Sequence, residues 1–397
     1  MPAPPCVCPP ASNPFLRGKL GRRQALRATG AGFVTTLAAL LAGAGRTARA
    51  QPAAGQAPVV DRLQVRIVTD NLTDRYSVPQ QTRGLGVERA GATERPGVAP
   101  HATLRAEWGL SMLAESTRAN GTPAGETRRV LIDFGYSPEV LLTNLGVLGI
   151  DPATLDALVL SHGHFDHFGG LMGLLASAGE RLKPGLPLFV GGEDCFCARQ
   201  GAGGVDYGVV DRPGILTAGI RLMVAEGPAV AAGHAVTSGH IPKVTYEDPL
   251  RATSERTGLV GGLGCDPALE PAVKNTSTYV PDDFQHEIAT SYVVRDRGLV
   301  VLMSCSHRGV LNSIRQAMAA SGATKLHAVV GGFHLPPPLD EDYVRRTVAE
   351  MKAMEPDWVI PAHCAGERFY DLARVEMPGR IVHSAVGSRF TFGTQAG

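Results

Sequence analysis

The segment Ser161–His167, with the sequence SHGHFDH, constrains this chain more than any other stretch. It places three imidazoles and one carboxylate within six residues, after an apolar run and before two glycines. Along an extended backbone His162 and His164 point the same way, whereas the adjacent Asp166 and His167 diverge and can serve a second ion. Neutral imidazole and carboxylate together suit zinc, and also iron or manganese. A polar loop with accidental histidines is the weaker interpretation, so the segment predicts a metal centre.

Three further apolar strands are predicted to end in loops that carry a histidine. Leu299–Met303 leads to His307, Ala328–Val330 to His334, and Trp358–Ile360 to His363. In layered α/β folds the chemistry gathers at the carboxyl ends of strands. Four such loops on one edge therefore predict two mixed sheets packed together, with helices outside.

Period and turn residues predict the remaining elements. We expect strands at Leu63–Val68, Glu107–Leu113, Arg129–Gly135 and Ser291–Val294. We expect helices at 137–148, from 168 onward, and at 310–320 and 340–354. The polar, glycine-rich segment Pro79–His101 predicts an extended loop, and residues 191–283, which hold few regular signals, predict a cap over the site.

Several motifs in this order resemble the metallo-β-lactamase superfamily, and within it a branch named after a dihydropterin-ribofuranosylaminobenzene-phosphate synthase. The matching segments are Trp108–Ser111, Ile132–Gly135, Leu160–Leu171, Cys305–Gly309, Gly331–Leu335 and Pro361–Gly366. The last three segments are specific to that branch. The resemblance implies an αββα sandwich that spans residues 59–397.

The resemblance also implies a ligand set for each of two metals. His162 and His164 hold the first metal, with His307 as the expected third ligand. Asp166 and His167 hold the second metal, with His363. Zinc is the expected ion and two ions are expected, with a single ion, iron or manganese as alternatives.

Four further residues are assigned other roles. Most members of the superfamily use a bridging Asp between the metals, and that slot here holds Cys305, which either takes the role or leaves the second position weak. Asp133 is expected to orient a ligand imidazole from behind. His334 is a candidate for substrate contact or proton transfer, and otherwise a structural histidine. His240 departs from the branch pattern and is an uncertain site residue.

The first 50 residues predict an export signal of the twin-arginine type. Arg22 and Arg23 precede an uncharged stretch rich in Ala, Gly and Thr, and Ala48–Ala50 matches a small-x-small cleavage site. A membrane anchor is the alternative, which the low hydrophobicity of the stretch disfavours. We therefore expect a signal at 1–50, a linker at 51–58, and a periplasmic or secreted domain with no lasting membrane anchor.

Charge narrows the class of partner. The net charge of +1 includes seven basic and no acidic residues in the first 50, so the remainder holds 31 basic and 37 acidic residues. This acidic balance disfavours nucleic-acid binding. We expect a small-molecule substrate as the partner, and the sequence does not specify the oligomeric state.

Five cysteines follow residue 50, and an odd number cannot all pair. Cys305 and Cys364 each lie close to a histidine in a candidate site loop, which argues against structural disulfides there. Cys195 and Cys197 are too close for an easy mutual disulfide, so we interpret them as a buried or exposed pair, with metal binding as the alternative.

A metal-activated water is the chemistry that such a centre offers. Zinc lowers the pKa of a bound water to about 7, which gives hydroxide at neutral pH. We therefore expect a hydrolase of an ester, lactone, amide or phosphoester, with Asp166 able to accept a proton. Lys243 and Arg308 are weaker candidates for binding an anionic group. A pterin-related synthase and an iron-dependent redox enzyme remain the alternatives.

Overall fold

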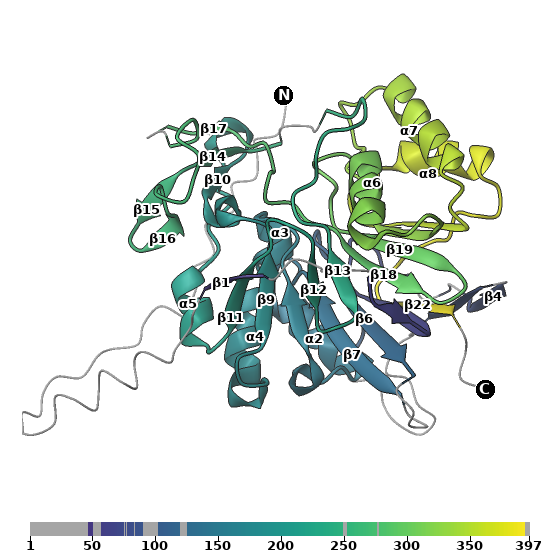
Figure 1. Ribbon diagram of the computed structural model, residues 1–397, viewed down its shortest axis with the longest axis horizontal. Coiled ribbons are helices and arrows are strands. Elements are labelled where there is room, and N and C mark those ends of the chain that lie inside the picture. Colours follow the sequence, from purple (N-terminus) through teal and green to yellow (C-terminus); the bar gives the residue numbers. More distant parts are fainter. Residues whose placement is uncertain are drawn as a thin grey trace, which may run out of the picture. The chain divides into compact units, whose positions relative to one another are not determined.

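Two β-sheets packed face to face organise the part of the chain described by the computed structural model (Figure 1). The structure describes residues 47–50, 57–74, 76, 78–82, 84–89, 102–119, 125–248, 252–275 and 278–393. Every described element belongs to one compact unit, Ala44–Gly397. The metal-binding motif lies where a strand of the first sheet ends, as the sequence predicts.

The first sheet contains ten strands and carries the histidine motif. In spatial order they are β1 (Ala48–Arg49), β11 (Arg221–Val224), β9 (Pro187–Val190), β8 (Ala157–Val159), β7 (Glu126–Ile132), β6 (Ser111–Arg118), β3 (Arg62–Thr69), β22 (Ser388–Gly393), β5 (Leu85–Arg89) and β4 (Gln80–Thr82). The strands from β7 through β8 and β9 to β11 are parallel. Their carboxyl ends therefore share one edge, and the motif follows β8 at that edge.

The second sheet supplies the other histidine loops. Its strands are, in order, β12 (Ala229–Ala231), β13 (Ala235–Thr237), β18 (Thr290–Val294), β19 (Gly298–Met303), β20 (Leu326–Gly331) and β21 (Trp358–Pro361), with β2 (Val59–Val60) paired to β18. Strands β19, β20 and β21 are parallel neighbours. The loops after these three strands consequently open on one edge of the sheet.

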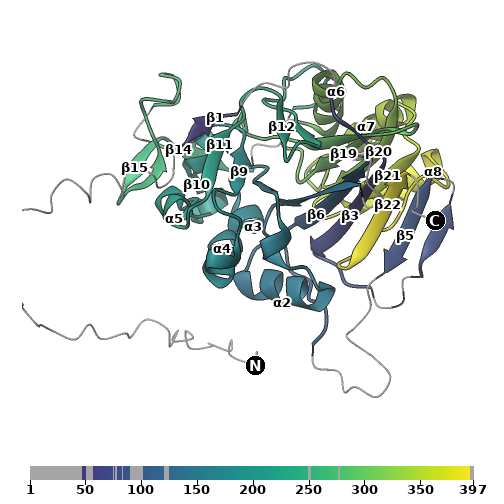
Figure 2. The ribbon, with the colours of Figure 1, turned by 60° about the horizontal axis from the view of Figure 1, so that its bottom comes forward.

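Helices cover the outer face of each sheet, as the views in Figures 1 and 2 show. Helices α2 (Pro138–Leu148), α4 (Leu171–Ala178) and α5 (Arg212–Thr217) pack on the first sheet. Helices α6 (Val310–Ser321), α7 (Glu341–Ala353) and α8 (Glu367–Glu376) pack on the second. Short helices connect other elements: α3 (Phe165–Phe168), η2 (Pro152–Thr154), η3 (Gly179–Arg181), η4 (Glu193–Phe196) and η5 (Ala202–Gly204).

Three buried apolar layers show why this arrangement is stable. The central layer joins the two sheets, with Val65 and Val159 from the first sheet and Val300 and Val330 from the second all fully buried. The other two layers lie between each sheet and its helices. Because each sheet is covered on both faces, the predicted αββα sandwich is confirmed.

Most local predictions hold, and the failures involve long-range pairing. The strand at Leu63–Val68 and the helix at 137–148 are confirmed. The strand predicted at Glu107–Leu113 begins only at Ser111. The loop predicted at Pro79–His101 is wrong in part, because β4 and β5 form there and β5 pairs with β22, some 300 residues later. Such a partner cannot be read from a local pattern.

The predicted cap region, residues 191–283, has a mixed structure. A three-stranded sheet of β10 (Ala198–Gln200), β14 (Ser254–Arg256) and β17 (Val280–Pro281) stands apart from the main sheets, as does the hairpin of β15 (Gly258–Val260) and β16 (Leu263–Cys265). However, β11, β12, β13 and α5 from the same region belong to the main layers. Only part of this segment is therefore free to shape the site.

The predicted export signal lies almost wholly outside the described residues. Ala48–Arg49, within the predicted cleavage site, pairs with the edge of β11 as β1. The linker at 51–58 is described only at residues 57 and 58. None of the described helices has the length and apolar character needed to cross a membrane. Signal, linker and export remain predictions.

Glu247 replaces the missing side-chain cap of α6. The residue before the helix is Gly309, and the buried Glu247 Oε2 instead accepts hydrogen bonds from Leu311 N (2.9 Å) and Asn312 N (3.1 Å). These are amides that a helix leaves unpaired at its start. Burial, which outweighs these hydrogen bonds, raises the pKa of Glu247 from 4.5 to about 7.

We predict that Glu247→Gln changes how stability depends on pH. Because the folded pKa lies above the unfolded value, the contribution of the carboxyl is full below pH 4.5 and is lost as pH rises toward 7. Relative to the Gln variant, the wild type should lose about 1–3 kcal/mol of unfolding free energy across that window. Urea unfolding of both proteins at several pH values measures this difference. A difference independent of pH would contradict the prediction.

Candidate metal centre

The loop after β8 presents the motif residues from a constrained backbone. His162 lies in a bend and His164 has an extended backbone directly before α3, which carries Asp166 and His167. Gly163 between the two histidines is required by close packing, because a Cβ there would lie 2.4 Å from Arg199 Nη1. The glycine thus lets the loop press against the buried arginine while the imidazoles point the other way.

His162, His164 and His307 form the first group of candidate ligands. All three are buried, and one nitrogen from each lies within 4.8 Å of the others. Nε2 of His162 and both ring nitrogens of His307 have no hydrogen-bond partner within the described residues. Thr253 Oγ1 lies 3.0 Å from His164 Nε2, which leaves Nδ1 of that ring for a metal. Buried nitrogens without partners are costly unless something binds them, so this group fits a cation.

Asp166, His167 and His363 form the second group. Asp166 Oδ2 lies 3.5 Å from His167 Nε2 and 3.3 Å from His363 Nε2. Nδ1 of His363 lacks a hydrogen-bond partner among described residues. The two groups therefore match the ligand sets predicted for two metals, and His162, which also approaches His167, lies between them.

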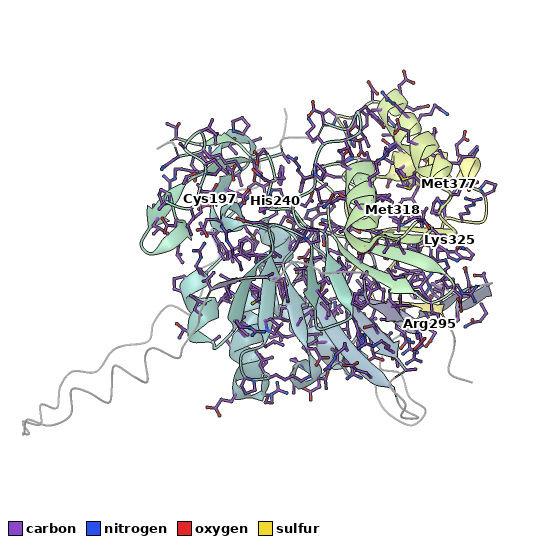
Figure 3. The ribbon with its side chains drawn as sticks, in the orientation of Figure 1. Cys197, His240, Arg295, Met318, Lys325 and Met377 are labelled. Carbon is purple, nitrogen blue, oxygen red and sulfur yellow. A yellow bond between two sulfur atoms is a disulfide. The ribbon has the colours of Figure 1, made fainter. Side chains whose placement is uncertain are left out.

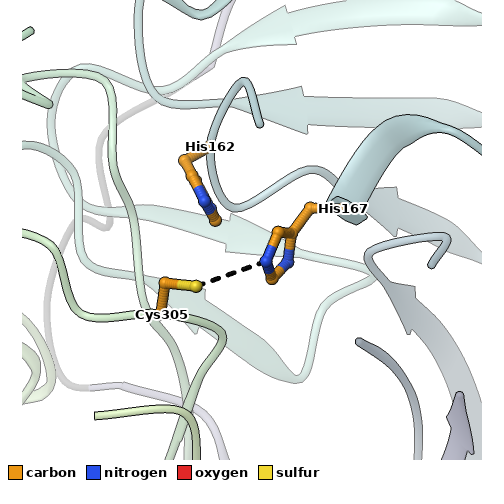
Figure 4. A group of neighbouring side chains, drawn as sticks. All are labelled: His162, His167 and Cys305. Atoms are coloured by element: carbon orange, nitrogen blue, oxygen red, sulfur yellow. Dashed lines mark hydrogen bonds between the residues drawn. The ribbon is translucent and has the colours of Figure 1, made fainter. Parts of the chain in front are cut away.

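Cys305 occupies the place beside these groups where an Asp was expected. Its Sγ lies 3.3 Å from His167 Nε2, and the two residues form a potential ligand group with His162 (Figure 4). The backbone after β19 thus delivers a thiol to the centre.

Asp133 holds the motif from behind, as the sequence suggested. Its carboxylate accepts hydrogen bonds from Ser161 N (2.7 Å) and Ser161 Oγ (2.6 Å), and lies 2.8 Å from His167 Nδ1. An ionised carboxylate only accepts, so His167 donates from Nδ1 and directs Nε2 toward the other candidate ligands, where a metal would take the place of its proton.

The electrostatics of the centre favour a bound cation. Burial opposes charge on His167, but the carboxylates of Asp166 and Asp133 outweigh it and raise the pKa of His167 to about 10. Burial lowers the pKa of His164 to about 3, and burial with neighbouring imidazoles holds the pKa values of His162 and His307 well below the usual 6.5. Three histidines are thus neutral, the form that binds metal, while the carboxylates supply negative charge.

Left-handed backbone conformations gather at this centre. Asp133 (φ 57°), Ser306 (64°), His334 (44°) and His363 (50°) all follow the ends of central strands. Such conformations are uncommon outside glycine and cost free energy that packing must offset. They turn each strand end sharply, so that side chains from four different strands converge.

Sequence reasoning missed several residues that position the ligands. Asp70, at the end of β3, accepts from His363 N at 3.0 Å. Glu287 accepts from His307 N at 2.8 Å, and Phe284 stacks on the His307 ring with centroids 4.0 Å apart. Acceptors for backbone amides leave no spacing signal in a sequence. Of these residues, Asp70 was the easiest to predict from the sequence, since it directly follows an alternating strand.

A cavity of about 580 Å³ opens over the candidate ligands. Trp108, Tyr136, Phe165 and Tyr207 form much of its wall, and Trp108 lies against the His363 ring with centroids 4.8 Å apart. Its floor contains His164, Asp166, Cys305, His307, His334, His363 and Cys364. Candidate metals would therefore face a largely aromatic chamber.

The two remaining candidate histidines, His334 and His240, have different surroundings. His334 lines the cavity, with its ring 4.2 Å from that of His307 and with Nδ1 lacking a hydrogen-bond partner within the described segments. Its proposed contact with substrate stays a prediction. His240 Nε2 instead lies 2.9 Å from the Gly191 carbonyl oxygen, away from the described cavity lining. The structure thus gives His240 a loop contact rather than a place in the centre.

Cys197 forms a disulfide with Cys265, 68 residues later, so the interpretation of Cys195 and Cys197 as an unbridged pair is wrong (Figure 3). The bridge joins the residue before β10 to the end of β16. Close by, the buried Arg199 binds Asp282 at 2.7 Å and contacts His286, whose Nε2 accepts from Gly163 N at 3.1 Å. Arg199 and His286 of the cross-linked cap therefore hold the backbone of the loop that carries His162 and His164.

The profile of the Metallo-beta-lactamase superfamily matches residues 124–363, which contain all the candidate ligands. The chain belongs to this superfamily. Members of the superfamily are metal-dependent hydrolases that bind divalent metals. The family predicted from the histidine motif is thus confirmed.

Individual relatives are distant. The chain is 27% identical over 274 residues to the 7,8-dihydropterin-6-methyl-4-(beta-D-ribofuranosyl)-aminobenzene-5'-phosphate synthase of Methanocaldococcus jannaschii, which covers 65% of this chain and 81% of that protein. An uncharacterized protein of the same organism is 25% identical over 263 residues, 66% of this chain and 87% of its own length. The crystal structure of Tm1679, described as a metal-dependent hydrolase of the β-lactamase superfamily, has a TM-score of 0.58 at 21% identity and covers 82% of this chain and 98% of that one. This structure supports the fold.

We predict that Asp133→Asn weakens metal binding by about 10–100-fold, because the amide cannot accept from Ser161 and orient His167 at the same time. Titration against a competing chelator measures the affinity. Asp296→Asn is a matched control, since Asp296 is exposed in the β18–β19 turn and has a similar φ of 58°. Equal affinities of the two variants would contradict the prediction.

Proposed function

We propose that this protein is a hydrolase that uses a zinc-activated water to cleave an uncharged ester or lactone. The observation that carries the proposal is the pair of adjoining ligand groups, His162/His164/His307 and Asp166/His167/His363. Four of these six side chains line the floor of an aromatic cavity, and His162 and His167 lie behind them. Zinc bound there would lower the pKa of a water ligand to about 7 and polarise the substrate carbonyl. The residues present fit that ion, because they offer neutral imidazoles and an ionised carboxylate.

Asp166 is the residue best placed to manage the proton of the attacking water. Burial opposes its ionisation, but the charges and hydrogen bonds of His167 and His363 hold its pKa well below the usual range. Its side chain remains 13% exposed on the cavity side, so it can reach a water. It orients that water by accepting a hydrogen bond, and His334 is available across the floor to contact the substrate.

The cavity chemistry narrows the substrate alternatives. Of the described residues that line it, none is Lys or Arg. The two basic candidates are engaged elsewhere: Arg308 donates to the carbonyls of Ile241 and Asp283, and Lys243 pairs with Asp248. An anionic phosphate group would therefore have the metal ions but no basic side chain as a partner of opposite charge in the described lining. A neutral carbonyl substrate with an apolar or aromatic portion suits these walls better.

This balance disfavours the pterin-related synthase as the first choice, since the name of the archaeal relative contains a phosphate. An iron redox enzyme is a further alternative that metal analysis distinguishes.

We retain export by the twin-arginine route in this proposal, on the support of the Arg22-Arg23 pair and the cleavage motif at Ala48–Ala50. A fractionation of cells that found only uncleaved protein in the cytoplasm would contradict it.

We predict about two zinc ions per chain in protein purified without chelator, and about one fewer in His162→Ala. Elemental analysis measures the content. The metal is expected to bind only the folded state. Protein in free metal at about 1,000-fold its Kd should therefore have an unfolding free energy about 4 kcal/mol higher than the same protein after chelation. Iron in place of zinc would favour the redox alternative. No metal, with no loss of stability on chelation, would refute the centre.

We predict that an aryl ester is hydrolysed with a kcat/KM about 100-fold above that of the aryl phosphate with the same leaving group. The expected factor corresponds to about 3 kcal/mol for the part of the phosphate charge that meets no basic side chain in the cavity. Steady-state assays of both substrates measure the ratio, with His162→Ala as the metal-deficient baseline. Faster hydrolysis of the phosphate would instead support the phosphate-directed alternatives.

A further inference from the structure

Two free cysteines meet at the floor of the cavity. Cys305 follows β19 and Cys364 follows β21, and their Sγ atoms lie 3.4 Å apart. Gly332, in the loop after the intervening β20, leaves room for this contact, because a Cβ there would lie 2.8 Å from Cys364 Sγ. Three consecutive strands of the second sheet thus cooperate to bring two thiols together.

The surroundings of these two thiols differ from those of an ordinary buried cysteine. A free Cys usually acts as a small apolar side chain, and the fully buried Cys195 does so within the apolar layer beneath the first sheet. Cys305 and Cys364 instead line the cavity among histidines, and neither belongs to the three apolar layers of the described structure. Packing alone does not account for them.

A second observation points to a ligand. The His363 side chain is only 1% exposed, and its Nδ1 lacks a hydrogen-bond partner among described residues, while its Nε2 lies 3.3 Å from Asp166 Oδ2. One ligand atom from each of Cys305, His363 and Cys364 lies within 4.8 Å of the others. A buried imidazole with an unpartnered nitrogen therefore lies beside the thiol pair.

The sulfur–sulfur distance fits one shared metal better than a disulfide. Two thiolates on a tetrahedral zinc, with Zn–S bonds of about 2.3 Å, are separated by about 3.8 Å. A disulfide requires about 2.05 Å. The observed 3.4 Å is much closer to the first value.

We propose that Cys305 and Cys364 bind the second metal ion together with His363, as thiolates. This rests on the proposed function, which places a metal at that position. Each thiol releases its proton to solvent as the metal binds. The sulfur ligands make the position soft, so it prefers zinc, cobalt or cadmium to manganese or magnesium. They also stand in for the bridging Asp that most members of the superfamily use.

Cobalt titration of metal-free protein tests this proposal. Imidazole and carboxylate ligands give Co²⁺ visible absorption, whereas thiolates add a charge-transfer band in the near ultraviolet. We expect that band to be about halved in Cys305→Ser or Cys364→Ser and absent in the double variant, with the visible bands retained. All proteins should carry Cys6→Ser and Cys8→Ser, because that pair is a further thiol source. Cys195→Ala is the matched control and should keep the full band.

The outcomes separate this inference from the function on which it rests. Visible bands without a near-ultraviolet band would overturn the thiolate ligands and leave the metal centre standing. No cobalt binding of any kind would overturn both. A Cys305–Cys364 disulfide in protein isolated without reductant, detected by mass spectrometry of its peptides, would also overturn the inference, because oxidised sulfur is not a thiolate ligand.

Discussion

The carboxylate of Asp133 is the contact on which the centre depends. It receives three buried donors, two from Ser161 and one from His167, and its own amide donates to Val159 O at 2.9 Å. These bonds join the ends of β7 and β8 to the start of α3. Loss of such an acceptor would cost about 1–3 kcal/mol of folding stability for each buried donor left without a partner. The ligand loop therefore has its shape before any metal arrives.

The other ligands are held by backbone contacts rather than by their own rings. Glu287 binds the amide of His307, and Asp70 binds the amide of His363. Since these acceptors take the main chain, the imidazole nitrogens stay free for a metal. The left-handed turns at His334 and His363 serve the same end, because they aim side chains inward from strands that run side by side. The strain is placed where ligands must converge.

Local patterns in the sequence predicted much of this structure. The alternation in Leu63–Val68 and the period of 137–148 depend on near neighbours, and both elements formed as expected. The convergence of His162, His307 and His363 followed from strand ends in parallel sheets. The Cys197–Cys265 bridge and the pairing of β5 with β22 could not be predicted, because each depends on residues far apart in the chain. Asp70 and Glu287 were missed for a different reason. An acidic residue that accepts a hydrogen bond from a backbone amide has no distinctive spacing in the sequence.

The position of β22 in the first sheet has a consequence for synthesis. Ser388–Gly393 pairs with β3 on one side and β5 on the other, so this strand lies inside the sheet rather than at its edge. Phe390 and Phe392 fill the layer between the two sheets. A nascent chain that has reached Cys364 holds every candidate ligand but still lacks this strand. The first sheet is therefore completed only after residue 393 has been translated, about thirty residues after the last candidate ligand.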